Sequence, residues 1–270
     1  FVFNLGAGIV LAVLTALVVI GGLQRLAAVS SRLVPFMTLL YCGGAAVGLL
    51  LNLERGPGAL ALIVQDAFTG AAAAGGALGS VILYGVQRGT FSNEAGIGTE
   101  ALAHGAARTR EPVREGLVAM LGPIIDTLVI CTATALMILL SGAWQTSGAS
   151  GVTLTAAAFG ELLGPVGHLI IVVSVVCFGV TTLFTYSYYG TKCFGFLFGA
   201  ERQDWYRWVY VLFIVLAAVV TLEAAIGIID GAFALMAIPT MVSSLLLAPR
   251  VKEVAARYFS GLRQEQGQSA

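Results

Sequence analysis

The sequence predicts an all-α membrane protein, and three observations support that prediction. Of the 270 residues, 58% are hydrophobic and only 10% are charged, whereas soluble domains have roughly 25% charged residues. The mean hydropathy is +0.93. Apolar runs recur at close to the roughly 20 residues that a helix needs to cross a bilayer core of about 30 Å. Lys plus Arg balance Asp plus Glu at 14 each, so the net charge favours no nucleic-acid partner.

Seven apolar runs are interpreted as membrane spans. They cover residues 5–20, 33–53, 75–107, 117–140, 169–198, 209–222 and 231–248. Pro35 is predicted in the first turn of the second span, where its missing N–H costs little. The apolar segment 59–68 is too short to span and is expected to lie along the membrane surface as a half-helix. Residues 153–164 are expected to form a short helix outside the spans.

Basic residues fix the orientation, because Lys and Arg collect on the cytoplasmic side of a membrane. They follow the first, third, fifth and seventh spans, and the opposite loops hold only Arg55. Residues 1–248 are therefore predicted to form a multi-pass transmembrane domain in the cell inner (plasma) membrane, and 249–270 a cytoplasmic tail. Residue 1 would then lie outside, an abrupt start, so we expect further helices of the same protein upstream.

Gln87–Glu100 is the densest polar and ionisable cluster in the chain, and the third span contains it. Irregular backbone at membrane depth survives only where protein buries it or where it lines a wet cavity. Gly89, Gly96 and Gly98 frame the cluster, and glycine accepts conformations that other residues avoid. We therefore predict that the chain between residues 87 and 98 is non-helical over several residues at mid-membrane. Transporters hold substrate and coupling ion at broken helices of this kind.

The ionisable residues of the cluster have two interpretations. Charges inside a span are costly and mark a functional site by default. Alternatively, Arg88 and Glu94 pair with each other and with freed carbonyls, and so hold the broken helix in place. Glu100 is the third ionisable residue of the cluster. The neutral side chains are then the better ligands, since amides and hydroxyls donate and accept and an aromatic ring can cover an aliphatic group. These neutral residues are Thr90, Phe91, Ser92 and Asn93.

Polar residues in the later spans also have two interpretations. Asp126 is either a cation or proton site or an internal partner for a hydroxyl-lined helix face. Thr181 and Thr182 could offer adjacent oxygens to a small hard cation such as sodium, but residue chemistry alone favours hydroxyls bonded back to their own helix. His104 is expected to be a satisfied helix histidine. The four cysteines have neither zinc nor disulfide spacing and are interpreted as packing residues.

The stretch Gly89-Thr-Phe-Ser-Asn-Glu-Ala-Gly-Ile-Gly98 resembles the signature of the alanine or glycine:cation symporter family, G-L-F-S-N-E-A-G-x-G. Further family-like stretches cover nearly the whole chain, among them Pro112-Val-Arg-Glu-Gly-Leu117, Ser187-Tyr-Tyr-Gly190 and Met236-Ala-Ile-Pro239. The resemblance implies a leucine-transporter-type inverted-repeat bundle, present in part, with the seven spans as core helices four to ten. The broken third span would be helix six.

The resemblance also implies site residues. Thr90, Phe91, Ser92, Asn93 and Gly96 would surround an amino-acid substrate. Thr181 and Thr182 would supply hydroxyls to a sodium ion, whose remaining ligands come from a helix one that is not in this chain. The chain departs from the family pattern at Thr99-Glu100-Ala101 and at Ile226, which bears on the identity of the substrate.

The expected function is secondary active transport without covalent chemistry, hence not an enzyme. A small neutral amino acid, alanine or glycine, would enter the cell with sodium by alternating access. A proton-coupled or other-substrate permease is the nearest alternative. A non-transporting membrane scaffold, in which the polar cluster only pins helices together, is the alternative from another class.

Overall fold

A computed structural model describes residues 2–68 and 78–268, and every regular element in them is helical. The elements group into two compact units. One comprises residues 1–83 and 129–221, and the other 84–128 and 222–270. The prediction of an all-α protein is confirmed for the described residues.

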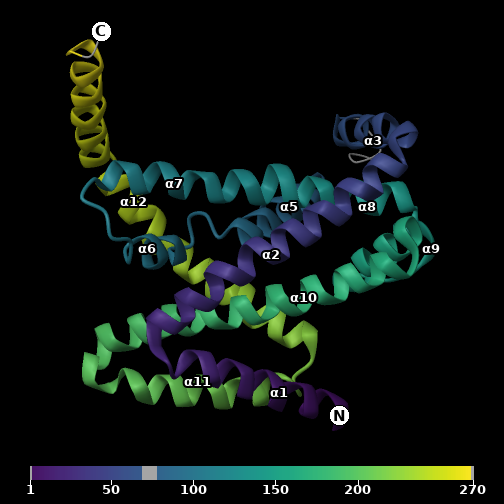
Figure 1. The fold of residues 1–270 in the computed structure, drawn as a ribbon, viewed down its shortest axis with the longest axis horizontal. Helices are drawn as coiled ribbons and strands as arrows, with labels where there is room; N and C mark the ends of the chain where they lie inside the picture. The colour runs from purple at the N-terminus through teal and green to yellow at the C-terminus, as the bar shows by residue number, and fades with distance from the viewer. Residues whose placement is uncertain (1, 69–77, 269–270) are drawn as a thin grey trace. The chain divides into compact units, whose positions relative to one another are not determined.

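The first unit contains most of the helices. Its elements are α1 (Val2–Val19), α2 (Gly22–Leu51), η1 (Leu53–Arg55), α3 (Gly56–Phe68), α8 (Thr132–Ser141), α9 (Ala143–Thr146), α10 (Val152–Phe198), η3 (Ala200–Arg202) and α11 (Gln203–Ala217). Helix α10 packs against α2, α8, α11 and α1, so it is the centre of this unit (Figure 1).

Tyr41 of α2 organises the core of the first unit. Its ring lies 5.4 Å from that of Phe159 and 6.0 Å from that of Phe178, both on α10, and Met137 of α8 is fully buried beside them. A Cβ added at Gly48 would lie 2.6 Å from the methyl carbon of Met137. The small residue therefore lets α2 and α8 approach closely, as membrane helix interfaces often require.

Helix α10 is two helices joined at a kink. Gly164 has φ 63° and ψ −148°, a conformation that glycine alone adopts readily, and Pro165 follows it as a residue that cannot continue the preceding hydrogen-bond ladder. The kink separates residues 152–163 from 165–198, which confirms the predicted short helix before the long fifth span.

The second unit contains the later part of α5 (Leu78–Asn93), α6 (Thr99–His104), α7 (Pro112–Ile124) and α12 (Leu222–Gln268). Residues 125–131 follow α7 as a π-helical segment, η2 (Ile125–Cys131), which leads into α8. Helix α12 packs on α7 and runs on through Pro239 and Pro249, so it crosses the predicted boundary at residue 248 without ending.

Several predicted boundaries were wrong. Helix α2 begins at Gly22 rather than near residue 33, so Pro35 lies in the helix interior. The charged residues that suggested a loop are compatible with helix; Arg25, for example, donates to the Leu17 carbonyl at 2.8 Å and satisfies the end of α1. Residues 75–77, the predicted start of the third span, lie outside the described residues.

Four helical stretches among the described residues are long and apolar enough to cross a membrane. They are Gln24–Leu51, Pro112–Ser141, Val152–Phe198 and Leu222–Gln264, and Phe3–Val19 is a shorter apolar helix. These lengths support an integral membrane protein. The total of seven spans and the inverted repeat stay predictions.

Candidate functional site

Helix α5 ends at Asn93 and α6 begins at Thr99, so the predicted break exists. Within residues 87–98 the non-helical part is 94–98, and residues 87–93 are helical. Glu94, Gly96 and Gly98 have φ values of 55°, 85° and 100°, in the region that L side chains rarely enter. Gly89 is helical, and only the two later glycines have the conformation that requires glycine.

The break leaves backbone groups open on both sides. The N–H of Glu94 still bonds to the Thr90 carbonyl at 2.9 Å, which completes α5. The carbonyls of Phe91 and Asn93 accept no backbone N–H from any described residue, and the N–H groups of Gly96 and Gly98 find no backbone acceptor there. Acceptors and donors of the main chain therefore lie within eight consecutive residues, 91–98.

Asn93 holds the end of α5. Its Oδ1 accepts from the Ala95 N–H at 2.9 Å, and its Nδ2 donates to Thr127 Oγ1 of η2 at 3.3 Å. The first bond is an Asx-type turn, which offers the chain an alternative to another helical turn. Since an amide nitrogen carries two hydrogens, Asn93 keeps one donor after the bond to Thr127.

Ser92 lies beside the π-helical segment. Its Oγ donates to Asp126 Oδ2 at 2.7 Å. Of the two interpretations of Asp126, the structure shows the internal partner for a hydroxyl. The segment η2 thus brings Asp126 and Thr127 to the two side chains that precede the break, and π turns are frequently found at functional sites.

Phe91 lies between a ring and a charge. Its ring centroid is 5.2 Å from that of Phe233 on α12, and the Arg88 guanidinium carbon is 5.7 Å from the Phe91 centroid. The two rings bring α5 and α12 together on the side of α5 that carries Arg88. Phe91 is half-buried, so part of the ring stays available to cover an apolar group.

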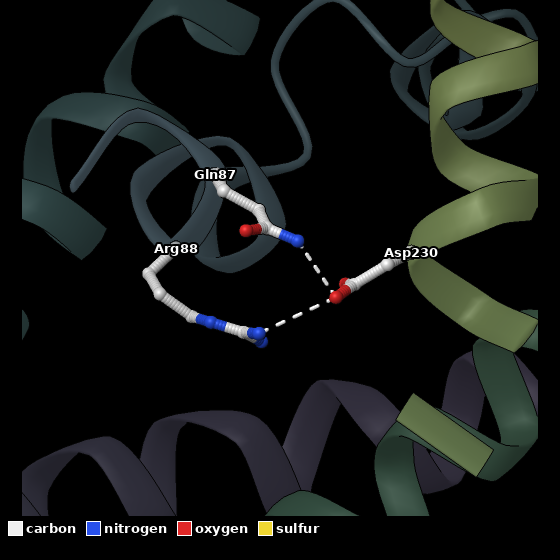
Figure 2. Close-up of polar contacts among 3 residues, drawn as sticks. All are labelled: Gln87, Arg88 and Asp230. Carbon is white, nitrogen blue, oxygen red and sulfur yellow. Dashed lines mark hydrogen bonds and ion pairs between the residues drawn. The ribbon is translucent and has the colours of Figure 1, made fainter. Parts of the chain in front are cut away.

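Asp230 of α12 joins this side of the site and was missed in the sequence. It accepts from Gln87 Nε2 at 2.7 Å and from an Arg88 guanidinium nitrogen at 3.3 Å (Figure 2). The interpretation in which Arg88 pairs with Glu94 is not the one that the structure shows, since the carboxylate that meets Arg88 here is Asp230. A signal existed, because Asp230 is the single carboxylate between Glu223 and Glu253, and a charge in an apolar run marks a partner or a site.

We expect Asp230→Asn to destabilise the protein more than Arg88→Gln, because two donors share the Asp230 oxygen and only one is lost with the arginine. The side chains are 21% and 47% exposed, respectively, so the Arg88–Asp230 coupling should be about 0.5–1 kcal/mol. A double-mutant cycle on thermal unfolding in detergent measures it, with Arg257→Gln at a separate exposed pair as control. Strict additivity of the two substitutions would contradict the pairing.

Helix α6 packs closely on its neighbours. Ile97 and Thr99 are 1% and 2% exposed. A Cβ at Gly98 would lie 2.7 Å from Thr240 Oγ1 of α12, which is closer than real Cβ atoms come. At the far end of α6, His104 Nδ1 lies 2.7 Å from Glu115 Oε1 of α7, as expected for a satisfied helix histidine. The start of α6 is therefore fixed in place by packing.

Thr181 and Thr182 belong to the first unit, whereas the residues of the break belong to the second. Thr181 is 6% exposed and its hydroxyl points back to its own helix, 2.9 Å from the Cys177 carbonyl and 3.0 Å from that of Phe178. This is the alternative that the residues alone favoured. Thr182 is exposed, since successive helix residues face directions about 100° apart. Their role at a sodium ion stays a prediction.

Comparison with known proteins supplies the family. A profile of the sodium:alanine symporter family matches residues 2–270. The chain belongs to this family. Its members are transporters rather than enzymes, which agrees with the resemblance carried by Gly89–Gly98.

Three relatives place the chain within the family. An uncharacterized transporter of Haemophilus influenzae is 39% identical over 94% of this chain and 57% of its own length. The sodium/alanine symporter AgcS of Methanococcus maripaludis is 36% identical over 97% of this chain and 58% of its own length. The probable sodium/glutamine symporter GlnT of Bacillus subtilis is 36% identical over 91% and 52%. The chain thus spans a little over half the length of these relatives.

Proposed function

We propose that the chain belongs to a symporter that moves a small neutral amino acid, alanine or glycine, into the cell together with sodium by alternating access. The observation that carries this proposal is the break between α5 and α6. An amino acid is a zwitterion, so its site needs acceptors for the ammonium group and donors for the carboxylate. The open carbonyls of Phe91 and Asn93 and the open N–H groups of Gly96 and Gly98 have these two chemistries.

The side chains around the break suit a small substrate. Thr90, Phe91 and Asn93 are half-buried, and Ser92 and Gly96 are exposed. The Ser92 hydroxyl donates its hydrogen to Asp126, so towards a ligand it can act only as an acceptor. Asn93 keeps one N–H that can donate to a ligand. We propose these five residues as the substrate site, with the Phe91 ring covering the substrate side chain.

Sodium is the proposed coupling ion and is a second substrate rather than a resident cofactor. Binding of both solutes must favour the same conformational state for transport to be coupled. The family description and the name of AgcS support sodium. A proton-coupled carrier is the alternative, and glutamine is a second candidate substrate because of the name of GlnT.

Uptake into membrane vesicles tests the proposal. Vesicles from cells that express the complete gene encoding this chain should accumulate labelled alanine or glycine when an inward sodium gradient is imposed. A choline gradient of equal size should give only the background of vesicles that lack the protein. Accumulation driven by a proton gradient alone would make the proton, not sodium, the coupling ion. A preference for glutamine would make glutamine the substrate in place of alanine or glycine. No accumulation of any of the three amino acids would contradict the proposal.

A further inference from the structure

An apolar groove lies between α7 and α12, both of which belong to the second unit (Figure 1). Its volume is about 570 Å³, within the range of about 300–1,000 Å³ that ligand pockets have. Helix α7 lines it between Pro112 and Met120, and α12 lines it between Leu247 and Phe259. Among the described residues of the lining, Arg250 alone is charged and the others are apolar. A ligand of this groove must therefore be mostly apolar.

The walls of the groove are open. Met120 of α7 is 62% exposed and Val251 of α12 is 64% exposed. A Cβ added at Gly116, which also lines the groove, would meet no atom within 4 Å. Both helices belong to stretches that are long and apolar enough to cross a membrane. The groove can therefore admit a chain of methylene groups from the surrounding lipid.

A polar hollow adjoins the groove and shares Arg250 and Val254 with it. Glu253 and Arg257 also line this hollow, and they pair with each other. No carboxylate of a described residue lies within ion-pair distance of Arg250. The hollow thus has one positive charge that its own carboxylate does not balance. A guanidinium matches a phosphate with two parallel N–H donors, so the charge suits a phosphodiester.

The sequence places this charge where the apolar part of each helix begins or ends. Arg250 is the first Lys or Arg after Arg207, and Arg114 is the last one before Lys192. Arg114 of α7 donates from Nε to the Tyr258 hydroxyl of α12 at 3.2 Å, which joins the two walls. The stretch Leu222–Gln264 has 43 residues, about 65 Å of helix, whereas a bilayer core is only about 30 Å thick. The basic end of α12 therefore extends to the level of the headgroups.

We propose that the groove between α7 and α12 binds one anionic phospholipid, with an acyl chain along the apolar walls and the phosphate on the Arg250 guanidinium. A purely apolar occupant would cover the walls but leave Arg250 without a counter-charge. The predicted orientation places this end at the cytoplasmic face, where anionic lipids give the leaflet a negative potential. The site shares no residue with the break, so it stands independently of the proposed symport.

Lipid retention tests the proposal in the protein expressed from the complete gene that encodes this chain. The protein is reconstituted in nanodiscs with equal amounts of anionic phosphatidylglycerol and zwitterionic phosphatidylcholine. Native mass spectrometry then counts the lipids that stay bound when the disc is dispersed. We expect one retained phosphatidylglycerol, preferred about fivefold or more over phosphatidylcholine, which is the effect of about one basic residue near an anionic lipid.

Substitutions at two glycines of α7 locate the acyl chain. Because the space beside Gly116 is open, Gly116→Leu should fill the groove without disturbing the fold and should abolish retention of the lipid. Gly122 is the matched control, since it is also helical with open space around it but lies outside the lining. Gly122→Leu should retain the lipid as the parent does, and thermal unfolding in detergent shows whether both variants are folded.

Substitutions on α12 locate the phosphate. Arg250→Gln should reduce the preference for phosphatidylglycerol to near parity, because the charge that distinguishes the two headgroups is lost, and Arg250→Lys should keep most of it. Lys252→Gln removes a cation of the same helix that lines neither the groove nor the hollow, and it should bind as the parent does.

Three results would overturn the site. The first is retention without a preference for phosphatidylglycerol, or with a preference that either Gly116→Leu or Arg250→Gln leaves unchanged. The second is the absence of any retained lipid, which would mean that another segment of the protein covers the groove. The third is a dimer that Gly116→Leu separates, which would make a second copy of the protein the occupant.

Discussion

Asn93→Ala should lower sodium-driven alanine uptake by about tenfold to hundredfold, the loss expected when hydrogen bonds to a charged ligand group are removed. The substitution removes the acceptor that binds the Ala95 N–H and the donor that binds Thr127, together with the one N–H left for a substrate. Cys131→Ala, a truncation at the end of η2, should leave uptake unchanged. Equal kinetics of the two variants would rule out a role for the amide.

Asn93→Asp separates the structural role of this side chain at the end of α5 from its proposed role in binding substrate. Aspartate keeps an oxygen for the Ala95 N–H, so the end of α5 should keep its shape, but it has no N–H for a ligand. If the amide nitrogen binds substrate, Asn93→Asp raises the KM for alanine about as much as Asn93→Ala. If Asn93 acts only at the turn, Asn93→Asp transports like the parent while Asn93→Ala does not.

Gly98→Ala should destabilise the protein by about 2 kcal/mol or more and abolish most uptake. The residue has φ 100°, and a non-glycine residue in a sparsely populated backbone region costs about 1–3 kcal/mol. The added Cβ would also lie 2.7 Å from Thr240 Oγ1, so either the threonine or the start of α6 must shift. The midpoint of thermal unfolding in detergent gives the stability, and vesicle uptake gives the function.

Two further glycine variants separate the cost of backbone strain from the cost of the contact with Thr240. Gly96→Ala has the unfavourable φ of 85° but no atom within 4 Å of the new Cβ, so it reports backbone strain alone. Gly89→Ala is helical with open space around it and should be neutral or slightly stabilising, by up to about 1 kcal/mol. A Gly98→Ala protein that unfolds at the same temperature as Gly89→Ala would show that neither cause operates.

The sequence was sufficient to predict the broken helix and the short helix before the fifth span, and glycine and proline determine the local backbone geometry at both places. Gly96 and Gly98 have positive φ, and the pair Gly164-Pro165 separates two helices. It was not sufficient to predict where α5 ends. Polar side chains at 87–92 suggested irregular backbone, but a helix tolerates them when a distant carboxylate accepts their hydrogens.

Those carboxylates come from elements far along the chain. Asp230 is 143 residues from Gln87, and Asp126 meets Ser92 from the π-helical segment η2. Tertiary partners and a change of helical pitch leave no local pattern around the break. The family signature identified the side chains near the break, but it did not include Asp230.

The π turn has a consequence for how this helix tolerates a change in length. Loss of one residue from an α-helix rotates everything after it by about 100°, but a π turn carries one residue more than an α turn needs. Deleting Ile125 would therefore let α geometry continue and keep Met137 and Leu140 in phase with their buried positions. Asp126 and Thr127 would meanwhile move one position along the helix, away from Ser92 and Asn93. A one-residue deletion at this point should yield a protein that folds but does not recognise its amino acid, whereas the same deletion within α8 should prevent folding.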